Sequence, residues 1–539
     1  MSPEKTSSAQ RMLDCAVATP HTLATEAAID TVRHGGNAVD AALTAAFVLT
    51  VVYPHNTALG GDLIALVRQK DGTITCVNSS GPASRNVSLA AYRERYGETM
   101  PVTGVDTITV PGAVAGLGAV HELGASRPWA DQLTVAHKLA KNGTPVAPSL
   151  DAAIKENLAL VLGDPGLAAV FAPNGSPLNT GDVMVQPALA NSFRELADHG
   201  PSVLYEGELG RTLIAALQKL GSQLDVADFA RFRPRFEEPL HGKFRQWDVW
   251  TSGPNSQGFL LLEILGALEA LNPSRDPLGN DAGVLSELFL ACAADREAFL
   301  ADPDAMTVST ADLLSGERLA KMARDAVEKT RLPESFSRVS MGRAKGDTVA
   351  IVTADDEGRA VCLIQSLFHS FGAGILEPST GIVMHNRGSF FSLSPTSANQ
   401  LAPARRPAHT LMPVMITKGE NLAWVMGTMG GKAQPQILTQ VLLRLVAGET
   451  PHDAVAAPRW VVGGIEVDKI DETASVELSI STQALRSIKA RLPVAELSHH
   501  DEATGHAQVV AVDASGSLVA ASDPRSDGHS DSSKVTARL

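Results

Sequence analysis

The chain has 539 residues, of which 44% are hydrophobic and 19% are charged, and its formal net charge is −14. This composition is typical of a globular protein that is long enough to bury a large core. The acidic balance gives no electrostatic attraction to nucleic acid or to an anionic membrane surface, so we expect neither as a partner.

The cysteines and the N-terminus exclude further classes of protein. Cys15, Cys76, Cys292 and Cys362 lie far apart and form no CxxC pair, which excludes a disulfide scaffold and a cysteine-based zinc site. We expect them to be free, buried thiols. The N-terminal segment MSPEKTSSAQRMLDC lacks the apolar stretch of a secretory signal, and the most apolar window, 41–53, is too short to cross a bilayer. We therefore expect a cytoplasmic protein.

Helices dominate the predicted elements of the first half of the chain. One helix is predicted over about 22–34 and ends at a glycine pair. The next follows Asn37, with Asp40 three residues later as a capping box, and its sequence AALTAAFVLTVV is apolar on every side, which predicts full burial. A strand pair joined by an Asp-Gly turn comes after it, and further helices are predicted over 258–272 and 284–300.

Strand pairs dominate the second half. Residues 331–347 have no periodicity and many polar residues, so they predict an exposed loop. The pairs TVAIVTA with RAVCLIQSL, and MPVMITK with LAWVMGT, precede a helix over 435–447 and a last hairpin. We expect the final residues, from Asp527 onward, to be frayed. Helices and strands are mixed without a regular βαβ alternation, which indicates an α+β fold.

The sharpest candidate for chemistry is Gly346-Asp347-Thr348, where the polar loop meets a strand. If the peptide bond before Thr348 is cut, its free α-amine, with an ordinary pKa of about 8, can take the proton of its own hydroxyl. The β-branch limits the rotamers of that hydroxyl, and Gly346 can adopt the strained backbone that attack on the Asp347 carbonyl needs. On the local sequence alone, a structural turn remains the competing interpretation.

A second candidate is Gly427-Thr428-Met429-Gly430-Gly431, directly before the 435–447 helix. Two adjacent glycines between a strand and a helix can point backbone N–H groups at one spot, which is what a developing oxyanion requires. Taken alone, the segment favours a plain tight turn.

Several segments in order along the chain resemble the gamma-glutamyltranspeptidase family. They are ATEAAIDTVRHGGNAVDAALTAAFVLTVVYPHNTALGGD (24–62), VPGAVAGLGAVHELG (110–124), FGAGI (371–375), STGIVMHN (379–386), GTMGG (427–431) and SDPRSDG (522–528). The resemblance implies a four-layer αββα N-terminal-nucleophile hydrolase sandwich made as one precursor. Self-cleavage between Asp347 and Thr348 would give a large subunit, 1–347, and a small subunit, 348–539.

The resemblance also implies the roles of four residues. Thr348 matches the nucleophile of the family, and Gly430 and Gly431 match its oxyanion glycines. Ser366 falls where the family has a hydroxyl residue hydrogen-bonded to the nucleophile, although a structural serine in a strand is an alternative. The implied reaction is amide hydrolysis or acyl transfer through a threonine acyl-enzyme, with no metal or organic cofactor.

The residues that grip a γ-glutamyl group in the family are not matched here. The stretch beginning at Asn78 lacks the carboxylate-binding Arg, Phe368 stands where the family has an Asn, and Ser389 or Phe390 replaces the amine-binding Asp. Val349 replaces the second Thr after the nucleophile, and AHTLMPVM does not match the paired serines of the family. The chain instead is similar to a divergent branch with oxamate amidohydrolase-like and cephalosporin acylase-like members.

Within that branch Arg387 becomes the candidate anchor for an acidic acyl group, because Arg binds carboxylates bidentately. His369 and His55 are candidate lining residues of the same pocket. Arg405, Arg406 and His409 are predicted in a loop over the site. The alternatives are an internal salt bridge for Arg387, structural roles for the two lining histidines, and ion pairing for the residues of the loop.

Three functions therefore compete. The first is an amide hydrolase or acyltransferase, acting by family default on γ-glutamyl compounds such as glutathione, or else on a small acidic amide or acylated amine. The second is a processing-dead binding protein, against which the intact Gly-Asp-Thr and Gly-Gly elements argue. The third is a metallohydrolase, but the one histidine cluster, His499-His500-Asp501, reads as a solvated loop. The expected partners are a small amide substrate and the two subunits of one precursor; a homodimer of the processed pair is left open.

Overall fold

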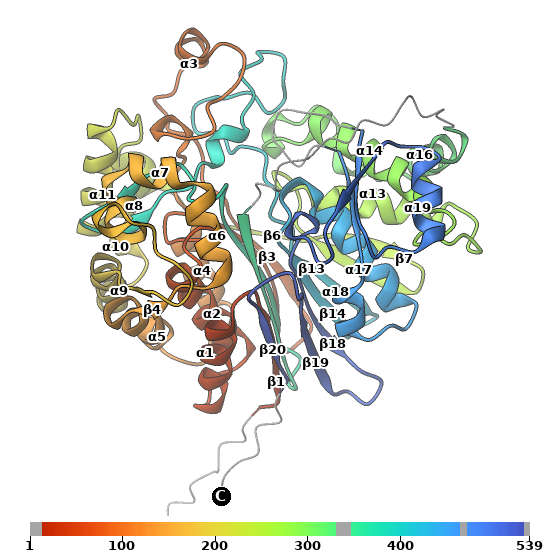
Figure 1. Ribbon diagram of the computed structural model, residues 1–539, viewed down its shortest axis with the longest axis horizontal. Coiled ribbons are helices and arrows are strands. Elements are labelled where there is room, and N and C mark those ends of the chain that lie inside the picture. Colours follow the sequence, from red (N-terminus) through yellow and green to blue (C-terminus); the bar gives the residue numbers. More distant parts are fainter. Residues whose placement is uncertain (1–12, 330–346, 464–471, 533–539) are drawn as a thin grey trace, which may run out of the picture.

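The computed structural model describes residues 13–329, 347–463 and 472–532. The loop predicted over 331–347 lies outside these residues except for its last position. Two antiparallel sheets face each other in the middle of the molecule, and helices cover the outer face of each sheet (Figure 1). This is the predicted four-layer αββα sandwich, and the α+β assignment is confirmed.

The first sheet has seven strands. In spatial order they are β20 (His529–Asp531), β1 (Cys15–Thr19), β9 (Asp347–Asp355), β10 (Ala360–Phe368), β2 (Asp62–Arg68), β3 (Ile74–Ser79) and β6 (Arg235–Glu237). The strands predicted after the polar loop are thus the central pair of this sheet, β9 and β10. The final residues were predicted to be frayed, but β20 pairs with β1, so that prediction is wrong for residues 529–531.

The second sheet has six strands and is built largely from the second half of the chain. In spatial order they are β19 (Leu518–Ser522), β18 (Ala507–Val512), β14 (Asn421–Thr428), β13 (Val414–Lys418), β8 (Trp247–Thr251) and β7 (Leu240–Phe244). The predicted pairs β13–β14 and β18–β19 are confirmed.

The alternation of side chains along β9 explains how the layers are held together. Val349 and Ile351 join the apolar core under the first helical layer, whereas Ala350 and Val352 join the core between the sheets. Successive side chains of a strand point to opposite faces. Thr348, two positions before Ala350, therefore faces the second sheet.

Helices rich in alanine, valine and leucine cover the first sheet. The capping box predicted for α2 is present, with Asn37 and Asp40 bonding reciprocally, and all residues of α2 are buried as predicted. The helices of this side are α1 (Thr22–Arg33), α2 (Ala38–Val52), α4 (Ala113–Glu122), α5 (Trp129–Asn142), α9 (Pro187–His199), α10 (Ser202–Tyr205), α11 (Glu208–Lys219) and α12 (Val226–Arg231).

A second set of helices covers the other sheet and includes the predicted ones after residue 258. They are α13 (Gly258–Glu269), α14 (Ala282–Phe299), α15 (Thr310–Leu313), α16 (Gly316–Glu328), α17 (Gln434–Val446), α18 (Pro451–Ala456) and α19 (Thr482–Lys489). A small sheet extends this side and consists of β15 (Trp460–Val462), β16 (Ala474–Glu477) and β17 (Val494–Leu497).

The remaining elements are short or peripheral. The helices are α3 (Leu89–Tyr96), α6 (Pro148–Glu156), α7 (Leu158–Gly163) and α8 (Pro165–Phe171), and the strand pairs are β4 (Thr144–Pro145) with β5 (Val183–Met184) and β11 (Leu376–Glu377) with β12 (Ile382–Val383). All four cysteines are free and buried, as predicted. Among the helices of the described ranges, none is both long and apolar enough to cross a bilayer.

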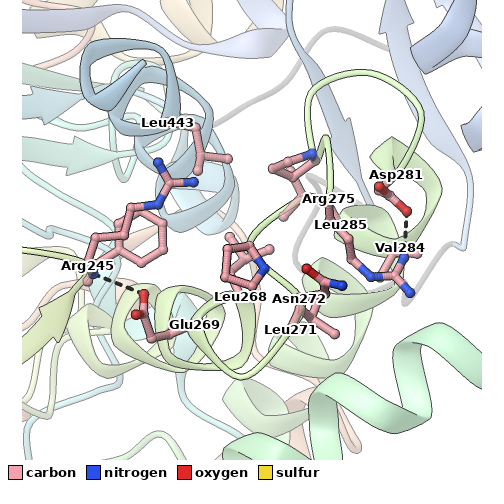
Figure 2. Close-up of a pocket in the computed structure, with 13 residues that line it drawn as sticks. Arg245, Leu268, Glu269, Leu271, Asn272, Arg275, Asp281, Val284, Leu285 and Leu443 are labelled. Carbon is pink, nitrogen blue, oxygen red and sulfur yellow. Dashed lines mark hydrogen bonds and ion pairs between the residues drawn. The ribbon is translucent and has the colours of Figure 1, made fainter. Parts of the chain in front are cut away.

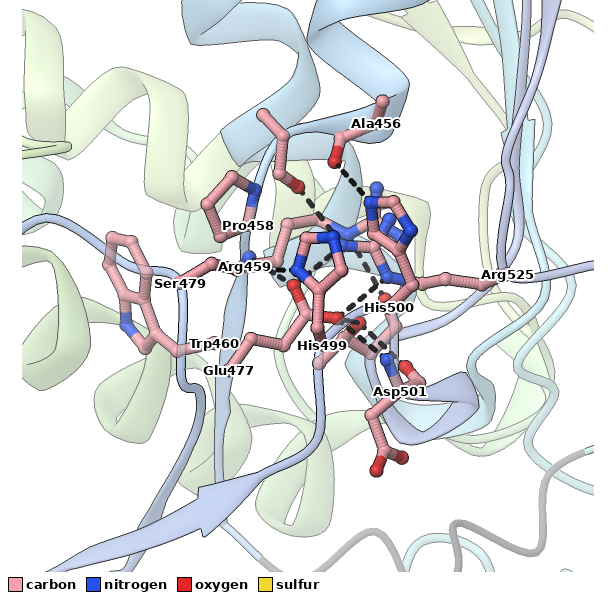
Figure 3. Close-up of polar contacts among 12 residues, drawn as sticks. Ala456, Pro458, Arg459, Trp460, Glu477, Ser479, His499, His500, Asp501 and Arg525 are labelled. Carbon is pink, nitrogen blue, oxygen red and sulfur yellow. Dashed lines mark hydrogen bonds and ion pairs between the residues drawn. The ribbon is translucent and has the colours of Figure 1, made fainter.

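A buried cluster of charges ties the SDPRSDG segment to α18 and β16 (Figure 3). Arg459 and Arg525 each bond the Asp523 carboxylate, at 2.6 and 2.9 Å, and Arg525 also bonds Glu477 at 2.6 Å. Their remaining N–H groups donate to backbone carbonyls, including those of Val455 and Gly505. Every guanidinium group here is matched by acceptors, which is the condition for burying such charges.

Candidate active site

Thr348 lies in a row of three polar side chains that crosses the first sheet. In the strand register Thr348 of β9 is opposite Ser366 of β10, and Ser366 is in turn opposite Asp62 of β2. Direct cross-strand partners share a face of the sheet, so all three point toward the second sheet. Thr348 is only 1% exposed, and its Oγ1 donates to Ser366 Oγ at 3.1 Å. The hydrogen bond fixes the direction of the Thr348 hydroxyl.

A β-bulge follows this row. The register shifts between Ser366 and Phe368, and Phe368 adopts a φ of +82°. A non-glycine residue at positive φ is uncommon and costs energy, so contacts must hold it. Its backbone N–H donates to Ser366 Oγ at 2.8 Å, and its ring lies 3.8 Å from the Arg387 guanidinium carbon. The bulge therefore links the Thr348 row to Arg387.

Arg387 is a buried cation whose charge has no anionic partner in the described part of the chain. It is 1% exposed at the start of the short 3₁₀ helix η4 (Arg387–Phe390), and its Nη1 bonds Thr410 Oγ1 at 3.4 Å. Its Nε and Nη2 atoms are buried without a hydrogen-bond partner among the described residues. Burial lowers the pKa of Arg387 to about 9, although the charge of Asp62 opposes this. Unsatisfied buried donors are costly, so the arrangement favours an incoming anion.

The glycine pair lies at the end of β14, beside the start of β9. Gly427 packs so closely against the first sheet that a Cβ there would lie 3.0 Å from Ala350 Cβ. The chain then turns through Gly430 and Gly431, which have φ values of +147° and +51° and lead through the 3₁₀ helix η5 (Gly431–Ala433) into α17. These are left-handed values that favour glycine.

Gln257 connects the glycine pair to the Arg387 region. Its Nε2 donates to the carbonyl of Gly431 at 2.8 Å and to the carbonyl of Thr410 at 2.9 Å. Thr410 also holds Arg387, so a continuous set of contacts runs from Thr348 through Phe368 and Arg387 to Gly431. The structure thus brings together five residues that the sequence singled out: Thr348, Ser366, Phe368, Arg387 and Gly431.

Asp62 organises the floor of the site. Its Oδ2 lies 3.2 Å from His409 Nε2 and 3.4 Å from His385 Nδ1, and its Oδ1 accepts from the N–H groups of Gly81 and Gly112. Burial would raise the pKa of Asp62, but His385 and His409 outweigh it and hold that pKa below its ordinary value. Burial also lowers the pKa of His409 to about 3, with Arg387 adding to the effect.

The loop predicted over the site is in fact largely buried. His409 is fully buried beside Asp62, and Arg406 is 8% exposed, with its Nε donating to the carbonyl of Ser80 at 2.7 Å. Arg405 is half-buried, and its carbonyl accepts from Ala83. Arg406 and His409 are therefore interior residues and do not cover the site from outside.

The other candidate pocket residues lie at different distances from this group. The His369 ring lies against the Phe368 ring, tilted by 33° with ring centroids 4.2 Å apart, and its Nδ1 lies 2.7 Å from Asn386 Nδ2. His55 packs between Tyr53 and Phe371, with centroids at 4.4 and 6.3 Å. Asn78 bonds Asn255 at 3.1 Å. His369 thus adjoins the Arg387 region, whereas His55 contacts Tyr53 and Phe371, and Asn78 contacts Asn255.

According to the resemblance, Ser389 or Phe390 replaces the amine-binding Asp of the family. Ser389 Oγ is buried without a hydrogen-bond partner in the described residues, and the Phe390 ring packs on Phe368 with centroids 5.4 Å apart. They supply no carboxylate for a substrate amine.

Sequence reasoning missed four residues of the site: Asp62, Gln257, His385 and Thr410. Asp62 ends the family segment 24–62, and His385 is the penultimate residue of the segment 379–386, so position within a motif was a usable signal for them. Gln257 and Thr410 carry no local signal. In addition, the described residues contain no group of three or more His, Cys, Asp or Glu side chains suited to a metal ion.

The family assignment rests on nearly the whole chain. The family model for gamma-glutamyltranspeptidase matches residues 24–533. The chain belongs to the gamma-glutamyltranspeptidase family. It is therefore an enzyme of the N-terminal-nucleophile hydrolase class, in agreement with the resemblance and with the four-layer fold.

Three relatives locate the chain within the gamma-glutamyltranspeptidase family. It is 34% identical to the glutathione hydrolase-like YwrD proenzyme of Bacillus subtilis, over 95% of this chain and 97% of the relative. It is 33% identical to the oxamate amidohydrolase proenzyme of Klebsiella pneumoniae, over 94% of this chain and 96% of the relative. The crystal structure of cephalosporin acylase from Bacillus halodurans superposes with a TM-score of 0.87 at 29% identity, covering 98% of this chain and 99% of that one.

Proposed function

We propose that the protein is an amide hydrolase that processes itself before Thr348 and acts on amides of small acids through a Thr348 acyl-enzyme. The single observation that carries the substrate class is the buried Arg387, whose Nε and Nη2 have no hydrogen-bond partner among the described residues. A carboxylate on the acyl group would satisfy both donors in a bidentate pair. The names of the relatives, which include an oxamate amidohydrolase, agree with an acidic amide.

Processing comes first in the proposed sequence. Thr348 Oγ1 attacks the carbonyl carbon of Asp347, the peptide C–N bond breaks, and the resulting ester is hydrolysed by water. The products are a large subunit, 1–347, that ends in a carboxylate, and a small subunit, 348–539, that begins with a free α-amine. The names of two relatives contain the word proenzyme, which supports a precursor.

Amide hydrolysis then follows at the same atom. The new α-amine takes the hydroxyl proton, Oγ1 attacks the substrate carbonyl, and the amine leaves with a proton. Water hydrolyses the acyl-enzyme and regenerates Thr348. Ser366, whose Oγ accepts from Thr348 Oγ1, would hold the attacking oxygen, and the N–H groups of Gly430 and Gly431 would stabilise the oxyanion.

Hydrolysis of γ-glutamyl compounds is the second candidate function, and the name of the Bacillus subtilis relative favours it. A γ-glutamyl group also carries a carboxylate that Arg387 could bind, but its α-amine needs an acidic partner. Ser389 and Phe390 offer none, and Asp62 already accepts from two backbone N–H groups and lies against two histidines. We therefore favour an acyl group without an α-amine.

The substitution Thr348→Ala tests the nucleophile. It should leave one uncut chain with no amidase activity, because it removes the attacking oxygen. Wild type should give two bands on a denaturing gel. Thr353→Ala is the matched control, since that hydroxyl is on the same strand but donates to the carbonyl of Ala38 at 2.8 Å, and this variant should process normally. Cleavage of Thr348→Ala at the same position would rule out self-processing by this residue.

A substrate panel tests the acyl group. Processed enzyme should turn over oxamate or a glutaryl amide faster than γ-glutamyl-p-nitroanilide. Strong turnover of the γ-glutamyl compound alone would refute the acidic-amide assignment while leaving the Thr348 chemistry intact.

A further inference from the structure

An apolar pocket opens on the helical layer that covers the second sheet (Figure 2). Its cavity volume is about 150 Å³. The end of α13, the start of α14, the end of α17 and the turn between β7 and β8 surround it. Its apolar wall includes Phe244, Leu268, Leu271, Val284, Leu285 and Leu443.

One cation at the rim of this pocket forms no ion pair with a residue that the structure describes. Arg275 is paired with Asp281 at 2.6 Å, and the Glu269 carboxylate accepts from the backbone N–H of Arg245 at 3.0 Å. The Arg245 guanidinium, by contrast, forms no ion pair or hydrogen bond with any residue that the structure describes. Its recorded contact is with the Phe244 ring at 5.3 Å. In Figure 2 this guanidinium extends toward Leu443.

The backbone of the β7–β8 turn holds Arg245 in place. Arg245 has a φ of +55°, a left-handed value that is uncommon outside glycine, and it directly follows Phe244, which pairs with Trp247 across the turn. Its N–H is anchored on Glu269 of α13. The turn thus fixes the start of the Arg245 side chain at the pocket, although the residue is exposed.

We propose that this pocket binds an unbranched aliphatic carboxylate. Its methylene chain would lie against the leucines of α13, α14 and α17, and its carboxylate would pair with Arg245. Apolar burial supplies the affinity, because each buried methylene contributes about 0.8 kcal/mol. The unpaired guanidinium favours an anionic head group over a neutral one.

The pocket is separate from the Thr348 region. Helix α13 begins directly after Gln257, which bonds Gly431, and reaches the pocket at its other end with Leu268 and Glu269. A helix of 12 residues is about 18 Å long. The bound carboxylate is therefore an additional ligand, and this proposal does not depend on the proposed function.

Calorimetric titration of the full-length protein with octanoate, decanoate and 1-octanol tests the proposal. Both carboxylates should bind saturably at one site, with decanoate about tenfold tighter because it buries two more methylenes. Arg245→Gln should weaken the binding of decanoate about fivefold and leave the binding of 1-octanol unchanged. Leu271→Trp, a half-buried position in the wall, should abolish binding of both.

Two controls separate this pocket from other cationic sites. Arg324→Gln, an exposed arginine on α16, and Arg387→Gln, in the Thr348 region, should both bind decanoate like wild type. Absence of saturable binding overturns the proposal. So does unchanged binding by Arg245→Gln, or loss of binding in Arg387→Gln, which would place the ligand in the Thr348 region instead.

Discussion

Two buried arginine sites in this molecule have opposite electrostatic designs. In the Arg459–Arg525 cluster every guanidinium donates to carboxylates or backbone carbonyls, with contacts of 2.6–3.2 Å. Arg387 is equally buried, yet its described polar contact is a hydrogen bond of 3.4 Å to Thr410, and two of its nitrogen atoms lack a partner in the described residues. The carboxylates of the cluster raise the pKa of Arg525 despite its burial, whereas burial lowers the pKa of Arg459 and that of Arg387.

The difference separates structural charges from charges that await a ligand. A buried ion pair whose donors are all matched contributes to holding the chain, here by tying the SDPRSDG segment to α18 and β16. A buried cation with free donors destabilises the unliganded protein and gains its partner only when an anion binds. If this interpretation is right, removing each arginine should affect a different property.

The largest expected effect is on stability, from Arg525→Met. Removing this guanidinium leaves Glu477 and part of Asp523 buried without their partner, so the free energy of unfolding should fall by about 3–5 kcal/mol. Urea denaturation measures it. Arg324→Met, on the exposed face of α16, is the matched control and should change little. A loss below about 1 kcal/mol for Arg525→Met would mean that the cluster is not the structural element we describe.

Arg387→Gln should lower the activity of the enzyme and not its stability. The value of kcat/KM for an acidic amide should fall about 100-fold, which corresponds to about 2.7 kcal/mol, because the bidentate pair is lost. Stability should stay the same or rise, since an unpaired buried charge is removed. Steady-state kinetics with oxamate, together with urea denaturation, measure both. A variant that loses stability but keeps kcat/KM would assign Arg387 to the structural class.

Much of the fold could be predicted from the sequence because its signals are local. The capping residues and uniform apolarity of α2, and the strand pairs on either side of the 355–358 turn, appear in consecutive residues. The strand β20 was missed because its three residues, His-Ser-Asp, carry no strand pattern, and its pairing is supplied by β1 at the other end of the chain.

The candidate site was only partly predictable for the same reason. The pairing of Thr348 with Ser366 follows from the register of two adjacent strands, so a motif comparison can find it. Gln257 reaches Gly431 across 174 positions, and His409 reaches Asp62 across 347, with no spacing rule to link either pair. The orphaned donors of Arg387 are likewise a property of three-dimensional packing, which no local pattern records.

Two buried glutamates, Glu477 and Glu263, show the same difference for the negative charge. Glu477 accepts from Arg525, Arg459 and Thr504, and its pKa lies below the ordinary value. Glu263 on α13 is fully buried beside Asp295, and Arg318 is 3.9 Å away. Burial, with Asp295 adding to it, raises the pKa of Glu263 to about 9.

That raised pKa predicts a pH-dependent stability. The folded protein holds a proton on Glu263 that the unfolded chain releases above about pH 4.5. The free energy of unfolding should therefore be highest at low pH and fall as the pH rises toward about 9, as far as it depends on Glu263. Glu263→Gln should therefore be more stable than wild type by about 2 kcal/mol at pH 8 and equal to it at pH 4. Equal stability at both pH values would show that Glu263 is compensated after all.

The smallest effect is expected at Phe368, which covers one face of the Arg387 guanidinium. Phe368→Asn removes the ring but suits the positive φ, because asparagine tolerates left-handed backbone. The KM for an acidic amide should rise about fivefold, the equivalent of a cation–π contact of about 1 kcal/mol, while kcat changes little. Phe299→Leu is the control, since that ring lies by Arg318 instead. If kcat falls and KM does not, the ring acts on the Thr348–Ser366 pair through the bulge and not on the carboxylate held by Arg387.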